Sequence, residues 1–365
     1  MLNILSSLLF IVIAILILGV CVVIHEFGHY ILARATGIDV VEFSVGMGPK
    51  IAGFRRKGID YSWRAIPLGG YCKFVGEDED SDDPKAFNNH KLWKRFLTVF
   101  AGPTFNVILA IILATVMYAS NSIYESVPKI YTVYEESAAA DAGLMPGDVI
   151  EQVNGVKIGY KTDGVELLRT FITEDEMTLS IRRGETRSEV KLTPKMMMTE
   201  GDARPSLMIG IVFDSDHPDY APVECFTASV KLIGQTAVLT VDYLKDLILN
   251  LFKGILPKSD ELAGPVGIVS SVSSEVKTGF SMGFGTGIIN IIYWLLVITV
   301  NLGIMNLLPF PALDGGRILF LLYELIRRKK VNQDRIGVIN LIGFGIMIVI
   351  IILITGSDIL ALFRR

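Results

Sequence analysis

The sequence predicts a polytopic α-helical membrane protein with four transmembrane helices. The first observation is the composition: 51% of the 365 residues are hydrophobic and 20% are charged, whereas an average soluble domain has about 25% charged residues. The mean hydropathy of +0.50 agrees with this prediction. The second observation is four uncharged stretches, each close to or longer than the roughly 20 residues that a helix needs to cross the hydrocarbon core. They are residues 4–24, 96–119, 278–313 and 336–357.

The four stretches divide the chain into eight predicted regions. The first stretch lacks basic residues after Met1 and a small-residue cleavage site, so we expect a transmembrane helix rather than a signal peptide. The third is longer than one span needs and begins glycine-rich, so its helix is expected to start near Gly287. In chain order the regions are a first transmembrane helix (1–36), a loop with β-hairpins (37–94), a second transmembrane helix (95–120), a small domain (121–197), a region with an amphipathic helix (198–283), a third transmembrane segment (284–316), a loop (317–335) and a fourth transmembrane helix (336–357).

Basic residues beside the spans predict the orientation, because cytoplasmic loops carry an excess of Lys and Arg. Three lie at 91–95 before the second span and five at 327–335 before the fourth. Arg364 and Arg365 oppose this assignment, but they are fewer. We therefore expect these two loops on the cytoplasmic side and residues 120–282 outside.

The segments between the spans are expected to contain β-structure and one amphipathic helix. In the first loop, two alternating runs with glycine-rich turns predict β-hairpins. The acidic cluster 77–83 that follows is interpreted as a solvated loop in preference to a metal or partner site. Between 127 and 194, short alternating runs predict a small domain of strands with one helix at 164–172. At 226–252 apolar residues recur with a helical period, which predicts a helix at the membrane surface or under the small domain.

The composition also excludes two classes of function. The net charge is −4 and no long block of Lys and Arg occurs, so nucleic acid is not an expected partner. Cys21, Cys72 and Cys225 lie far apart without a CxxC motif. Neither a thiolate zinc site nor a disulfide framework is available to this chain.

The segment His25-Glu26-Phe27-Gly28-His29 lies at the C-terminal end of the first span. On a helix, His25 and His29 are one turn apart, so both imidazoles reach one metal ion, and Glu26 lies beside them where it can hold a water molecule. This spacing is typical of zinc hydrolases. The alternative is a pair of histidines that caps a transmembrane helix, although such polar groups at membrane depth are costly unless they are paired or functional.

A catalytic zinc site usually has three protein ligands and one open position, so the third ligand must come from elsewhere. His90 and His217 are poorly placed for this role. Asp314 is the better candidate, because it follows a stretch in which Pro309 and Pro311 remove helix donors and must break the third span. Irregular backbone at membrane depth lines a cavity or is buried. The alternative is that Asp314 only caps the helix that follows it.

Together these motifs resemble the site-2 protease family of intramembrane zinc metalloproteases, and most closely its bacterial branch with an extracytoplasmic PDZ domain. The resemblance implies that His25, His29 and Asp314 bind one Zn²⁺, that Glu26 is the general base, and that Asn306 contacts the substrate backbone or the developing oxyanion. Further matching segments are residues 46–50, 66–71, 264–268 and Ala101-Gly102-Pro103 with Asn106.

The resemblance also assigns roles to the segments outside the spans. It implies that a membrane-associated β-loop offers an edge strand to an unwound substrate, and that residues 121–197 form an α+β PDZ domain that screens substrate size. The implied substrate-binding residues are Gly69, Gly70, Tyr71, Cys72, Lys73 and Phe74.

The implied activity is cleavage of transmembrane segments of single-span proteins in the bacterial inner membrane. Anti-sigma factors and signal-peptide remnants are the implied substrates, after a first extracytoplasmic cut, and membrane lipid is the other expected partner. Two alternatives stay open. A membrane-anchored PDZ binding module with a structural zinc ion would not need Glu26, and a zinc transporter would require vectorial zinc flux through the broken third span.

Overall fold

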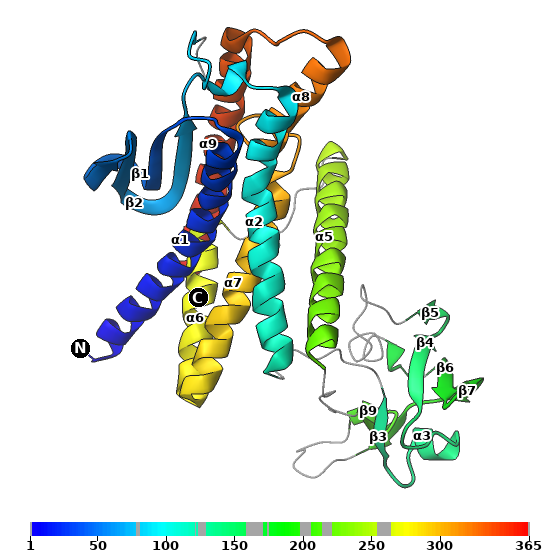
Figure 1. The fold of residues 1–365 in the computed structure, drawn as a ribbon. Coiled ribbons are helices and arrows are strands. Elements are labelled where there is room, and N and C mark those ends of the chain that lie inside the picture. The colour runs from blue at the N-terminus through cyan, green and yellow to red at the C-terminus, as the bar shows by residue number, and fades with distance from the viewer. Residues whose placement is uncertain are drawn as a thin grey trace. The chain divides into compact units, whose positions relative to one another are not determined.

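The structure is a computed structural model that describes residues 2–77, 81–120, 122, 129–157, 171–173, 175–197, 206–213, 221–253 and 264–363. The chain forms two compact units (Figure 1). The first combines Met1–Ser122 with Ala221–Arg365, and the second is Ile123–Tyr220.

Four helices of the first unit are long and apolar enough to cross a membrane, counted over the described residues. They are α1 (Leu2–Thr36), α2 (Leu92–Ala119), α7 (Phe284–Asn306) and α9 (Gln333–Phe363). The helices α1, α2 and α7 pack against one another (Figure 1). Helices long and apolar enough to span a membrane therefore occupy all four predicted spans, and α7 begins three residues before the predicted Gly287.

Two further helices pack beside these spans. The helix α6 (Pro265–Met282), which the sequence did not predict, packs against α1 and α7. The helix α5 (Pro222–Phe252) lies lengthwise along α2 and α7 (Figure 1). Thr115 of α2 donates a hydrogen bond of 3.1 Å to Ser229, and Thr240 donates one of 3.5 Å to Asn301 of α7.

The contacts of α5 with α2 and α7 correct the prediction that this amphipathic helix lies at the membrane surface. The alternative, that it packs under the small domain, stays a prediction. The hydroxyl groups of α5 account for the incorrect placement at the membrane surface. Ser229, Thr236 and Thr240 each donate to the backbone carbonyl one turn earlier, at 2.6, 2.9 and 2.9 Å. Such bonds satisfy the hydroxyl within its own helix. Serine and threonine residues that the sequence pattern assigns to the solvent-facing side can therefore pack against other helices.

The first loop folds into one antiparallel sheet made of two long, bent strands, β1 (Val40–Arg56) and β2 (Ile59–Phe74). The β1 segment from Glu42 to Val45 pairs with residues 60–63 on one side and with residues 70–73 on the other. The C-terminal part of β2 therefore has only one strand neighbour among the described strands. Its inward side chains Cys72 and Phe74 are buried in a cluster with residues of α1, α2 and α8.

The third span ends at Asn306, and seven residues separate it from the helix α8 (Asp314–Arg327). The connecting segment contains Pro309 and Pro311, so the predicted break is present. This segment folds back onto the first turn of α8, where a Cβ atom on Gly315 would overlap the carbonyl groups of Leu307 and Leu308. The residue at the N-cap of α8 is Leu313, which makes no side-chain cap, so Asp314 is not a helix cap.

The second unit is a small α+β fold with a core of its own. The strands β4 (Val149–Val153), β5 (Val156–Lys157), β6 (Met177–Arg183) and β7 (Thr186–Leu192) form a sheet in the order β5-β4-β6-β7. The short helix α3 (Ala138–Asp141) is capped at its N-terminus by Ser137, whose Oγ accepts the Ala140 N–H at 3.1 Å. The core includes Ile130, Ile150, Val153, Leu179 and Ile181, all at most 1% exposed.

The small domain extends beyond its predicted end at residue 197. The strands β8 (Lys195–Met197) and β9 (Ser206–Met208) pair with each other, and β10 (Ile211–Phe213) pairs with β3 (Ile130–Val133). The predicted boundary is therefore too early, because the last strand returns to pair with the first. The helix predicted at 164–172 lies almost wholly outside the described residues.

Candidate metal centre

Three predicted ligand atoms meet at the break of the third span. The helix α1 places His25 and His29 one turn apart, with relative exposures of 5% and 7%, and their Nε2 atoms lie 3.2 Å apart. Asp314, the first residue of α8, places Oδ2 at 3.0 Å from His25 Nε2 and 3.3 Å from His29 Nε2. Asp314 is 285 or more positions from either histidine in the chain, and the break in the third span brings it to them.

The chemistry of this donor set fits a zinc ion. His29 Nδ1 lies 2.8 Å from the carbonyl oxygen of Thr98, so Nδ1 carries the ring proton and Nε2 keeps its lone pair. No hydrogen-bond donor among the described residues is paired with the buried Asp314 Oδ2. Lone pairs that face one another at this distance repel unless a cation lies between them. In a tetrahedral zinc site with bonds of about 2.0–2.1 Å, ligand atoms lie roughly 3.3 Å apart, as they do here.

The helices α1 and α2 pack closely against each other beside the two histidines. A Cβ atom on Gly28 would lie 2.5 Å from the carbonyl oxygen of Ala101, and a Cβ atom on Gly102 would overlap the imidazole of His29. Only glycine permits the two helices to approach so closely at these positions. The segment Ala101-Gly102-Pro103 therefore provides the space in which the two imidazoles lie.

Glu26 lies beside the ligands in a cavity of about 510 Å³. Residues 70–74 of β2, called the edge segment below because they have one strand neighbour among the described strands, form another wall of this cavity. A Cβ atom on Gly70 would lie 3.3 Å from Glu26 Cγ. The Asn306 side-chain amide nitrogen lies 3.4 Å from His25 Nε2. The structure thus brings together Glu26, Asn306, the three ligands and the predicted substrate-binding residues, since Gly69, Gly70, Tyr71, Cys72, Lys73 and Phe74 all line the cavity.

The other two histidines do not join this centre. His90 lies 3.1 Å from the Gly37 carbonyl oxygen through its Nε2 atom, and His217 lies outside the described residues. Cys72 lines the cavity, and burial together with the nearby charges of Glu26 and Glu77 raises the pKa of its thiol. Among the described residues, the ligand atoms that lie within 4.8 Å of one another belong to His25, His29 and Asp314, and Cys72 Sγ is not one of them.

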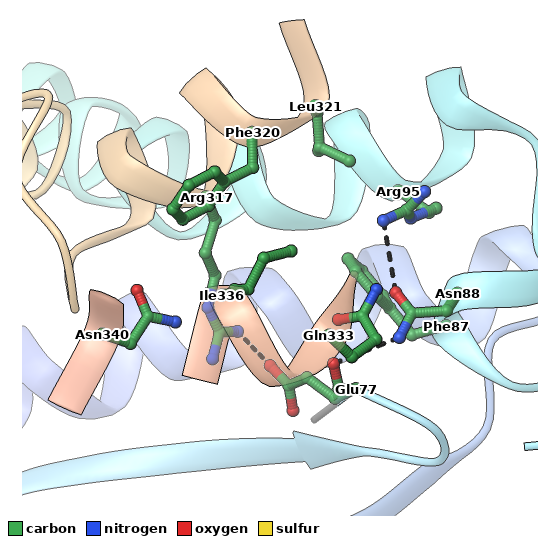
Figure 2. A pocket seen from close by; sticks show the side chains of 10 residues that line it. All are labelled: Glu77, Phe87, Asn88, Arg95, Arg317, Phe320, Leu321, Gln333, Ile336 and Asn340. Atoms are coloured by element: carbon green, nitrogen blue, oxygen red, sulfur yellow. Dashed lines mark hydrogen bonds and ion pairs between the residues drawn. The ribbon is translucent and has the colours of Figure 1, made fainter. Parts of the chain in front are cut away.

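Two ion pairs that the sequence did not predict hold α8 in place after Asp314. Arg95 of α2 and Glu324 of α8 form a buried pair at 2.6 Å. Arg317, one turn after Asp314, pairs with Glu77 (Figure 2). Glu77 Oε2 also accepts the backbone N–H of Phe74 at 3.1 Å. The same carboxylate therefore joins the end of the edge segment to the helix that carries the third ligand.

Glu77 also corrects the interpretation of the acidic cluster as a solvated loop. Its side chain is 6% exposed, whereas Asp82 in the same cluster is exposed. Composition alone does not distinguish these acidic residues. The position of Glu77 directly after the apolar segment that ends at Val75 was the one available signal for its burial.

A second carboxylate stabilises the sheet itself. Burial raises the pKa of Glu42, but hydrogen bonds donated by Ser62, Arg64 and Tyr71 outweigh burial and lower it to about 2. The Ser62 and Tyr71 bonds measure 2.5 and 2.7 Å. This network joins the three neighbouring segments of the sheet, so it holds the edge segment in place over the cavity.

An HExxH helix completed by a distant carboxylate, set among helices that can cross a membrane, defines an intramembrane zinc metalloprotease. Comparison with known proteins agrees. The chain belongs to the site-2 protease family, because the model of peptidase family M50 matches residues 13–350.

Two relatives match this chain over almost the whole length of both proteins. A candidate zinc metalloprotease of Clostridium acetobutylicum is 33% identical over 351 residues, covering 96% of this chain and 97% of that protein. The regulator of sigma-W protease RasP of Bacillus subtilis is 28% identical over 432 residues, covering 96% and 98%. Among solved structures, the PDZ domain of an SdrC-like protein of Listeria monocytogenes is similar at 16% identity with a TM-score of 0.20, covering 25% of this chain and 90% of that one.

Proposed function

We propose that this protease cuts transmembrane segments of single-span membrane proteins inside the membrane, with anti-sigma factors and signal-peptide remnants as substrates after a first extracytoplasmic cut. The observation that carries the proposal is the convergence of His25, His29 and Asp314 with Glu26 in a cavity walled by an edge segment of β2. The name of the Bacillus subtilis relative, regulator of sigma-W protease, supports anti-sigma factors as the substrate class.

His25, His29 and Asp314 would hold one Zn²⁺, which supplies a Lewis acid that polarises the scissile carbonyl and lowers the pKa of a bound water towards about 7. The Glu26 carboxylate accepts the proton of the attacking water and returns it to the nitrogen of the leaving amine. Asn306, beside His25 on the cavity wall, donates its amide hydrogens to the carbonyl oxygen on which negative charge develops.

The edge segment of β2 accounts for how a helical substrate becomes accessible. A transmembrane helix keeps its carbonyl groups in internal hydrogen bonds, so the segment to be cut must unwind. A strand with one free side can form backbone hydrogen bonds with an extended peptide. Residues 70–74 have only one strand neighbour among the described strands and border the cavity, so they can compensate the bonds that unwinding breaks.

The basic loops support an arrangement in which the sheet and the metal centre lie towards the cytoplasmic face of the bacterial inner membrane. The second unit then lies outside as a PDZ domain. In this position it screens substrates by the size of their outer part, so that only proteins already cut on that side reach the cavity.

The decisive experiment compares wild type with Glu26→Gln on a model single-span substrate truncated on its outer side. Purified proteins are matched for bound zinc, and the product is followed by gel mobility and mass spectrometry. We expect cleavage by wild type only, because a carboxamide cannot accept the proton. Equal results for both proteins, either cleavage or none, would contradict the proposal and favour a binding protein with a structural zinc ion.

A further inference from the structure

Asn106 of α2 is a fully buried polar side chain beside a metal ligand. It is 0% exposed, and the nitrogen of its carboxamide lies 3.2 Å from His25 Nδ1. Its oxygen, Oδ1, is buried and has no hydrogen-bond partner among the described residues. A buried carboxamide oxygen without a donor costs free energy, so this arrangement needs an explanation.

The tautomer of His25 supplies the explanation. Nε2 of His25 is the atom that faces Asp314 and His29, so it must keep its lone pair if it binds a metal ion. Nδ1 then carries the ring hydrogen and needs an acceptor. The two ends of a carboxamide have nearly the same size and shape. Turning the Asn106 amide by half a revolution presents Oδ1 to the Nδ1 hydrogen, which satisfies both groups at the observed distance.

The other histidine shows the same arrangement. His29 Nδ1 donates to the backbone carbonyl of Thr98 at 2.8 Å. Thr98, Gly102 and Asn106 are spaced by four residues, which places them on one face of α2. On this face the Thr98 carbonyl orients His29, Gly102 leaves room for both imidazole rings, and the Asn106 side chain contacts His25.

We propose that Asn106 is a positioning residue that accepts the Nδ1 hydrogen of His25 through Oδ1 and so fixes the metal-binding tautomer of that ligand. The inference rests on the proposed ligand set of His25, His29 and Asp314. Partners of this kind hold the orientation of a metal-bound imidazole, and their loss typically weakens metal affinity by 10 to 100-fold.

The test uses zinc affinity of the full-length protein in detergent, measured by competition with a chelator. Asn106→Leu keeps much of the volume but has no acceptor, so we expect zinc affinity to fall about 10 to 100-fold. Asn106→Asp keeps an acceptor and has no N–H to donate, so we expect affinity at least equal to that of wild type. The matched control is Asn301→Leu on α7, where the same substitution removes an amide that donates to the Val297 carbonyl, and affinity should not change.

The visible spectrum of the cobalt-substituted protein is the second readout, because it reports ligand geometry. We expect Asn106→Asp to keep the wild-type spectrum and Asn106→Leu to alter it. Zinc affinity of Asn106→Leu equal to wild type would overturn the proposal. So would a loss in Asn106→Asp, because it would show that the amide hydrogens are needed. His25→Ala tests the ligand set separately: unchanged zinc affinity there would refute the set itself, and with it this inference.

Discussion

Gly102 is the residue where one added methyl group should disable the centre. A Cβ atom added at this position would overlap the His29 ring and lie 2.8 Å from His25 Cε1. The α2 backbone cannot easily move away from α1 to make room, because Gly28 of α1 packs directly against Ala101, the neighbour of Gly102. We therefore expect Gly102→Ala to lower kcat/KM about 100-fold or more through displaced ligands, with a matching loss of bound zinc by metal analysis.

The control for this substitution is Gly345→Ala on α9, where a Cβ atom meets nothing within 4 Å. Both changes add one methyl group to a helix that can span the membrane, so they share any effect on helix propensity. Gly345→Ala should keep wild-type activity and zinc. If Gly102→Ala also kept them, the close approach of α2 to the imidazoles would not be required for metal binding.

Asp148 is the residue that makes the second unit sensitive to acid. Its carboxylate is 0% exposed and accepts hydrogen bonds from Arg183 at 2.6 and 2.7 Å and from the Met145 N–H at 2.9 Å. Burial raises the pKa of Asp148, but these bonds outweigh it and leave the pKa below its usual value. A lowered pKa stabilises the folded state above about pH 4, and this stabilisation is lost as pH falls through the folded pKa.

Amide hydrogen exchange in β4 and β6 measures this contribution. At pH 7 we expect Asp148→Asn to lower the protection factors roughly tenfold. On acidification below about pH 4, wild-type protection should fall towards that of the variant. Equal protection of both proteins at pH 7 would show that the pair with Arg183 does not stabilise the unit.

At the scale of elements, Glu77 joins the edge segment of β2 to α8. Its carboxylate accepts the Phe74 N–H and pairs with Arg317, and Arg317 lies one turn after Asp314. We expect Glu77→Gln to lower kcat/KM about tenfold, because both the substrate-binding segment and the third ligand become less well held. The measurement is cleavage of the truncated model substrate together with chelator competition for zinc.

The matched control is Asp82→Asn, which removes one charge from the same acidic cluster at an exposed position. It should leave cleavage unchanged. A similar loss in both variants would mean that the overall charge of the cluster matters, rather than the contact between Glu77 and Arg317.

The elements differ in how far the sequence could predict them. The spans follow from hydropathy alone, and the break before α8 follows from Pro309 and Pro311, because proline removes helix donors. The helix α6 was missed because Glu275 and Lys277 interrupt its apolar pattern. The packing of α5 was missed because hydroxyl groups that bond to their own helix look the same in sequence as groups that face water.

The residues of the metal centre also differ in how far the sequence could predict them. His25, Glu26 and His29 share one helical turn, so local spacing predicts them. Asp314 could be inferred from its place after the break. Arg95 and Glu324 are 229 positions apart, and no local pattern connects them. Asn106 matched a family segment, but its contact with His25 depends on how α1 and α2 pack.

At the scale of the whole molecule, the second unit has its own core and is inserted between two parts of the first. The chain leaves the first unit after Ser122 and re-enters it at Ala221. The buried cluster around Ile130, Ile150 and Leu179 is formed within the second unit. This unit can therefore be replaced by a flexible Gly-Ser linker while the cluster that supports the sheet around Phe74, Val99 and Leu321 keeps all its members.

This replacement tests the screening role proposed for the second unit. Wild type should cleave a single-span substrate that lacks its outer domain and leave the uncut substrate intact. If the unit only excludes bulky substrates, the variant without it should cleave both at similar rates, and adding Glu26→Gln should abolish both activities. If the variant still rejects the uncut substrate, selection occurs at the cavity, where an extended segment must reach the edge of β2. If it cleaves neither, the unit presents substrates rather than excluding them.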